Sequence, residues 1–120
     1  MRFSNAFGTI DLPITSVAIG LPLNGTGSSV VDTSSLKNVT FSGSPSITIP
    51  NGALAVSDVI ELDVQAKTTI SVTVYLAKGQ QSDSITSHPG SRTTSWFVQG
   101  NHIGVEDLKE VQGATGVDHW

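Results

Sequence analysis

The sequence predicts an all-β fold, and more closely a single β-sandwich of jelly-roll type with seven to nine short strands. Serine and threonine are abundant, and both suit the exposed faces of strands better than helix surfaces. Apolar residues alternate with polar ones over short stretches, which is the pattern of a strand with one face on a core. Clusters of glycine, proline and asparagine interrupt these stretches about every ten residues, as turns between strands do.

Length and composition fit one domain. A chain of 120 residues can bury about 65% of the surface that its unfolded form exposes, so it needs no cross-link to have a core. The sequence contains no cysteine, which excludes disulfides and thiolate metal sites. No stretch is long enough to be a linker between two domains. We therefore expect one β-sandwich domain over residues 1–120.

Alternating stretches predict the strands in chain order. In 14–23, Val17 and Ile19 lie on the face expected to contact the core. The stretch 70–76 has the most regular alternation and is the expected central strand, with Tyr75 on the face opposite its core residues. Further strands are expected, in order, at 2–6, 30–31, 39–41, 47–49, 53–56 and 60–64, in the second half of 87–101, and from 117 onward.

Turn sequences separate these strands. Pro50-Asn51-Gly52 is the strongest signal, because proline sets φ at the first central position of a turn and asparagine or glycine tolerates positive φ at the next. Apolar residues spaced three apart predict a short helical turn at 105–111. The other connections are expected at 5–8, 24–29, 32–35, 43–45 and 78–86.

Charge and hydropathy exclude two classes of partner. The formal net charge is -4, and the six basic residues are scattered rather than clustered. A phosphate backbone needs a concentrated basic surface, so we expect no nucleic acid partner. No apolar run reaches the roughly 20 residues that span a bilayer, so we expect no membrane insertion.

Two sequons point to the secretory pathway. Asn24-Gly25-Thr26 and Asn38-Val39-Thr40 are both acceptor triplets for N-glycosylation, which makes Asn24 and Asn38 candidate modification sites. Residues 1–5 lack the apolar centre of a signal peptide. We nevertheless expect a secreted, extracellular protein.

The sequence offers no catalytic residues, cofactor motif or metal site. A Gly-x-Ser-x-Gly elbow and a Gly-Asp-Ser block are both absent, and the histidines at 88, 102 and 119 have no ligand spacing that favours a metal. The acids form no calcium loop. Glu61 and Asp63 share one face of an expected strand, where a solvated face is far commoner than a catalytic carboxylate pair.

The stretch 87–101 concentrates the side chains best suited to contact a ligand or another domain. It contains His88, Arg92 and Trp96, and Tyr75 lies on a neighbouring expected strand. An exposed Trp96 would stack on a pyranose ring, whereas a buried one would be a core or interface residue. Likewise, Arg92 would either bind a ligand or brace the turn, and His88 would be a contact residue or simply a turn residue before Pro89.

Three segments carry a resemblance to a known family, and they occur in the family's order along essentially the whole chain. They are Arg2-Phe3-Ser4-Asn5-Ala6-Phe7-Gly8, Phe41-Ser42-Gly43-Ser44-Pro45-Ser46-Ile47-Thr48-Ile49-Pro50 and His88-Pro89-Gly90-Ser91-Arg92-Thr93-Thr94-Ser95-Trp96. The chain resembles the N-terminal β-sandwich domain of secreted SGNH (GDSL-type) ester hydrolases of fungi and bacteria. Ala55-Val56-Ser57-Asp58 and Val74-Tyr75-Leu76 extend this similarity.

The resemblance implies a non-catalytic accessory domain. In the family an α/β/α hydrolase domain follows the sandwich and supplies the Gly-Asp-Ser block, the oxyanion-hole residues and a late Asp-x-x-His, none of which occurs here. We therefore expect a domain truncated at both ends that is not an enzyme by itself. Its expected partner is an SGNH catalytic domain or another copy of itself. The alternative is a stand-alone carbohydrate-binding, lectin-like module with glycans as ligands.

Overall fold

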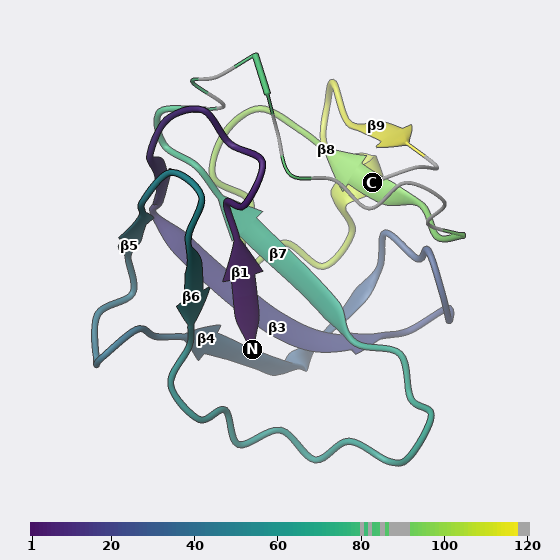
Figure 1. Cartoon of the computed structure of the whole chain (residues 1–120). Coiled ribbons are helices and arrows are strands. Elements are labelled where there is room, and N and C mark those ends of the chain that lie inside the picture. Colours follow the sequence, from purple (N-terminus) through teal and green to yellow (C-terminus); the bar gives the residue numbers. More distant parts are fainter. Residues whose placement is uncertain (80, 82, 85, 87–91, 118–120) are drawn as a thin grey trace.

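The computed structural model describes residues 1–79, 81, 83, 84, 86 and 92–117. Nearly all of its regular structure is antiparallel β, which confirms the predicted all-β, sandwich-like class (Figure 1). A short 3-10 turn at Leu108–Glu110 confirms the predicted helical turn at 105–111. The strands are β1 (Arg2–Ser4), β2 (Leu12–Ile14), β3 (Ser16–Pro22), β4 (Val31–Val39), β5 (Ile47–Ile49), β6 (Leu54–Val56), β7 (Ser71–Tyr75), β8 (Ser95–Phe97) and β9 (Thr115–Val117).

A three-stranded sheet of order β4-β3-β7 and two strand pairs, β1-β6 and β2-β5, enclose the main core. Core residues come from all of these elements except β1 and β7, and partly buried Phe3 of β1 packs its ring edge-on against Phe41 at 5.5 Å between centroids. Val17 and Ile19 lie in this core, as their alternation predicts. The buried cluster consists of Ile14, Val17, Ile19, Val39, Phe41, Ile49 and Ala55.

The central strand is β3, so the prediction that 70–76 is central is wrong. Strand β7 lies at the edge of the sheet, and its Val72 and Val74 are 38% and 42% exposed. Strand β3 instead has neighbours on both sides and is buried on both faces. A Cβ on Gly20 would lie 2.9 Å from a methyl group of Val31, which shows how closely side chains of β4 approach this residue of β3. Alternation alone cannot distinguish an edge strand from a central one.

The prediction of a strand at 60–64 is also wrong, because residues 57–70 form no strand. Ile60 and Leu62 do pack against the core, and Glu61 and Asp63 are exposed as expected. The alternation therefore reports which side chains point inward. It does not report backbone pairing, which also requires a neighbouring strand with free hydrogen-bonding groups.

The predicted polar connection at 32–35 belongs to strand β4, whose register against β3 shifts at this point. The Ser35 hydroxyl donates to the Asp32 carbonyl at 2.6 Å and accepts from the Leu21 N–H at 2.8 Å. This hydroxyl thus bonds a backbone N–H of β3 at the point where the register of the two strands shifts. The Asp32 carboxylate accepts from the Ser34 hydroxyl and N–H, which lowers its pKa.

Asn5 is a buried polar residue, 5% exposed, that joins two turns to the core. Its side-chain amide donates to the carbonyls of Ile10, Ile49 and Pro50 at 2.8, 3.2 and 3.3 Å. These bonds hold the predicted turn at 5–8 against the end of β5 and the Pro50 turn. Buried carbonyls need such partners, so Asn5 supports this end of the sandwich.

The Asp58 carboxylate fixes a tight hairpin turn. Residues Ser42 and Gly43 have φ of 51° and 82°, and Phe41 and Ser44 exchange backbone bonds of 2.7 and 3.0 Å around them. Asp58 accepts from the Thr40 hydroxyl at 2.6 Å and from the N–H groups of Ser42 and Gly43 at 2.9 and 2.8 Å. The hydroxyl bond, followed by the two N–H bonds, lowers the pKa of Asp58.

Asp58→Asn is therefore expected to lower stability at neutral pH and to flatten its acid dependence. Because the folded-state pKa of Asp58 lies below its usual 3.8, the stabilisation is complete above the unfolded-state value and is lost as the pH falls through the folded-state value. Urea unfolding between pH 2 and 7 measures this effect. Asp63→Asn, which removes the same charge from an exposed side chain, should keep the wild-type acid dependence; identical profiles for the two variants would contradict this role.

Candidate functional site

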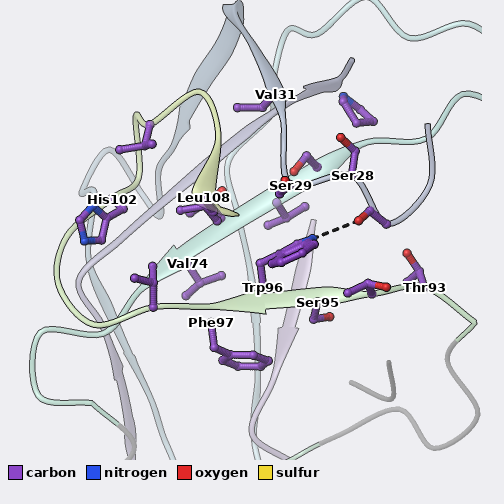
Figure 2. A pocket seen from close by; sticks show the side chains of 18 of the residues that line it. Ser28, Ser29, Val31, Val74, Thr93, Ser95, Trp96, Phe97, His102 and Leu108 are labelled. Atoms are coloured by element: carbon purple, nitrogen blue, oxygen red, sulfur yellow. Dashed lines mark hydrogen bonds between the residues drawn. The ribbon is translucent and has the colours of Figure 1, made fainter. Parts of the chain in front are cut away.

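A groove of about 530 Å³, called here the Trp96 groove, is the main candidate site (Figure 2). It lies among β7, β8, the loop that precedes β4, and the segment that leads into the 3-10 turn. Residues from all four elements line it, including Ser29, Val74, Trp96, His102 and Leu108. The groove is open to solvent and within the size range of small-molecule sites.

Trp96 is the structural centre of this groove. Its indole N–H donates to the Gly27 carbonyl at 3.0 Å, which ties β8 to the loop before β4 (Figure 2). Across the β8-β9 pair it faces Gly116, where a Cβ would lie 3.3 Å from the indole ring. The absence of a side chain at Gly116 allows the ring to lie close against β9. The indole is half-buried, so both alternatives for Trp96 apply in part: it packs against β9, and it lines a groove.

The described lining of the groove lacks carboxylate, ammonium and guanidinium groups. Among the described residues that line it there is no aspartate, glutamate, lysine or arginine. Serine and threonine hydroxyls alternate instead with aliphatic and aromatic side chains. At one end, His102 Nε2 lies 2.9 Å from the Gln99 carbonyl oxygen, so this ring is held within its own turn. The groove can thus offer hydrogen bonds and apolar contact without a fixed charge.

Two of the four predicted contact residues belong to the described lining of the groove. Trp96 and Tyr75 both line the groove. Arg92 is exposed and is not part of the lining, and His88 lies outside the described residues. The sequence did not single out Ser29, Leu108 or His102 for this groove, because they come from segments separated along the chain. Only the alternation around Tyr75, which marked a second face of β7, could have pointed to it.

The two sequons lie in different settings. Asn24 is exposed in the loop between β3 and β4, and Asn38 is exposed on the edge strand β4, opposite Ala18 of β3. The following Thr40 hydroxyl donates to Asp58. Both asparagine side chains thus reach the surface of the folded chain.

A second feature is a hollow of about 330 Å³, called here the apolar hollow. The exposed side chains of Val59 and Val64 border it. Its lining includes Ile19, a core residue that is only 4% exposed. Val59 is 95% exposed and Val64 48%, and both belong to the irregular segment 57–70. The core is therefore thinly covered here, and apolar side chains project from its border into solvent.

No group of three metal-ligating side chains lies together in the part of the chain that the structure describes. Within that part, no helix is long and apolar enough to cross a membrane. Neither a protein-family model nor a curated protein sequence matched this chain.

Proposed function

We propose that this chain is a secreted, non-catalytic accessory domain of an SGNH-type ester hydrolase, and that it packs on the α/β/α catalytic domain through the apolar hollow. The partner would supply the nucleophile, oxyanion hole and histidine. The resemblance of three segments of the sequence to the N-terminal sandwich of these hydrolases supports the choice of partner. The chain alone is expected to give no turnover of a short-chain chromogenic ester.

The single observation that carries the proposal is the apolar hollow above Ile19. Complete burial of an exposed valine side chain against a partner contributes about 1.5–3 kcal/mol to the free energy of binding. Val59 exposes nearly its whole side chain beside the thinly covered core. Contiguous apolar surface of this kind is typical of a face that meets another domain or protein.

Binding in trans tests the proposal. The catalytic domain of a two-domain SGNH hydrolase is expressed without its own sandwich and titrated calorimetrically with this chain. We expect wild-type chain to bind and the double variant Val59→Ser/Val64→Ser to bind at least about tenfold more weakly, because two apolar contacts are lost. Leu23→Ser is the matched control, since Leu23 is 56% exposed but lies outside the hollow.

Two outcomes would contradict the proposal. One is the absence of binding by wild-type chain. The other is equal weakening by Leu23→Ser and by the double variant, since the hollow would then have no special role. Light scattering on the chain alone separates a further alternative: concentration-dependent dimers that disappear in the double variant would assign the hollow to a second copy and overturn the choice of a hydrolase domain.

A further inference from the structure

The Trp96 groove has the composition of a binding site for an uncharged, hydroxyl-rich ligand. The described lining contains no aspartate, glutamate, lysine or arginine, although the whole chain has six basic and ten acidic residues. A charged ligand would lose hydration on entering and find no opposite charge in return. The groove therefore selects against carboxylated or sulfated molecules.

Its two kinds of lining side chain match the two surfaces of a sugar ring. The half-buried indole of Trp96 and the aliphatic side chains of Val74 and Leu108 offer apolar contact (Figure 2). Apolar C–H faces of pyranose rings pack against such surfaces, and tryptophan is the largest of the aromatic side chains. Ser29 also lines the groove, two residues after Gly27, whose carbonyl accepts the indole N–H bond. The Ser29 hydroxyl can both donate and accept a hydrogen bond.

The position of the Trp96 ring in the groove is also fixed by contacts within the protein. The indole N–H bond to Gly27 and the close approach of Gly116 set the position of the Trp96 ring in the free protein. A ring held in place loses little side-chain freedom when a ligand stacks on it. A cavity of about 530 Å³ is also within the usual range for small-molecule sites.

From these observations we infer that the Trp96 groove binds a neutral saccharide, with a pyranose face against the Trp96 indole and sugar hydroxyls bonded to serine and threonine hydroxyls of the walls. This binding function goes beyond docking on a hydrolase domain and does not depend on it. The groove and the apolar hollow have different linings apart from Ile70.

Titration of the ¹⁵N-labelled chain with defined oligosaccharides tests the inference. The neutral probes are cellohexaose, xylohexaose and mannohexaose, and hexagalacturonate is a charged probe of equal length. We expect at least one neutral probe to shift the Trp96 indole N–H resonance and the amides of Gly27 and Ser29. Hexagalacturonate should leave these resonances unchanged.

Three variants locate the site. Trp96→Ala is expected to weaken binding of the neutral probe about tenfold, through loss of the stacking surface. Because Trp96 also anchors β8, Ser29→Ala is the second variant; it should keep the thermal stability and weaken binding about threefold to tenfold, as the loss of one hydrogen bond does. Arg92→Ala, at an exposed residue outside the groove, should bind as wild type.

The outcomes show whether a saccharide binds and whether it binds in the Trp96 groove. No shift with any neutral probe at millimolar concentration would overturn the inference. Equal binding of hexagalacturonate would overturn the argument from charge. If the probe causes the same resonance shifts in Ser29→Ala as in wild type but none in Arg92→Ala, the saccharide binds outside the groove. None of these results depends on whether the chain binds a hydrolase domain.

Discussion

Asn5→Ala is expected to destabilise the protein by about 2–3 kcal/mol, because it leaves the buried carbonyl of Ile49 and the part-buried carbonyls of Ile10 and Pro50 without this donor. Asn5 is 5% exposed, and its amide reaches the carbonyls of Ile10, Ile49 and Pro50. Water cannot fully replace these bonds at a buried position. The free energy of unfolding in urea measures the loss. Asn51→Ala is the control, because Asn51 is exposed and donates one side-chain bond, to the Thr9 carbonyl at 3.1 Å; its effect should stay within about 0.5 kcal/mol.

Gly8 provides a second check on the same contact. A Cβ on Gly8 would lie only 1.9 Å from Asn5 Oδ1, so Gly8→Ala must displace the Asn5 amide from its carbonyl partners. The cost should therefore be large in the wild-type background and much smaller in an Asn5→Ala background. Such non-additivity is the mark of residues in direct contact. Additive effects in the double-mutant cycle would contradict this arrangement.

Ile49→Ala is expected to have an equal or larger effect, a loss of about 2–5 kcal/mol. Ile49 is completely buried, and it belongs to the cluster that joins the β2-β5 pair to the face of β3 and β4. Truncation removes buried methyl and methylene groups and leaves a cavity that the surrounding strands fill only in part. A domain of this size has a total stability of about 5–15 kcal/mol, so the loss is a large fraction of it.

Chemical denaturation with Val59→Ala as the matched control measures this effect. Val59 is 95% exposed in the free chain, so its truncation should change the free energy of unfolding by less than about 0.5 kcal/mol. The contrast also bears on function, since the same Val59 is expected to matter once a partner domain covers the hollow. Similar small losses for both variants would mean that the core does not centre on Ile49.

The two proposed binding surfaces lie in different parts of the fold. The apolar hollow borders the main core, whereas the Trp96 groove depends on the β8-β9 pair and its link to Gly27. A protein that docks through the hollow can therefore keep the groove open for a saccharide.

Local sequence patterns predicted much of the sandwich. The pattern at 14–23 placed Val17 and Ile19 in the core. The Pro50-Asn51-Gly52 turn forms, with the Ala53 N–H donating to the Pro50 carbonyl at 3.1 Å, but Asn51 and Gly52 occupy its two central positions and Pro50 precedes them. These features follow from φ preferences and from the two-residue period of a strand, which act between near neighbours. The failures have a common cause. Whether 60–64 pairs, and whether 70–76 is central or at an edge, depends on segments far away in the sequence.

The sequence by itself determined that this chain is all-β and that it has a short helical turn near residue 108. Only the tertiary structure decided that Trp96 meets the Gly27 carbonyl, 69 residues away, and that Val59 borders a hollow above Ile19. The physical reason is that alternation and turn chemistry are local, whereas a groove or a hollow is made by the packing of distant segments. Candidate binding surfaces in this protein therefore belong to the arrangement of its strands rather than to any motif.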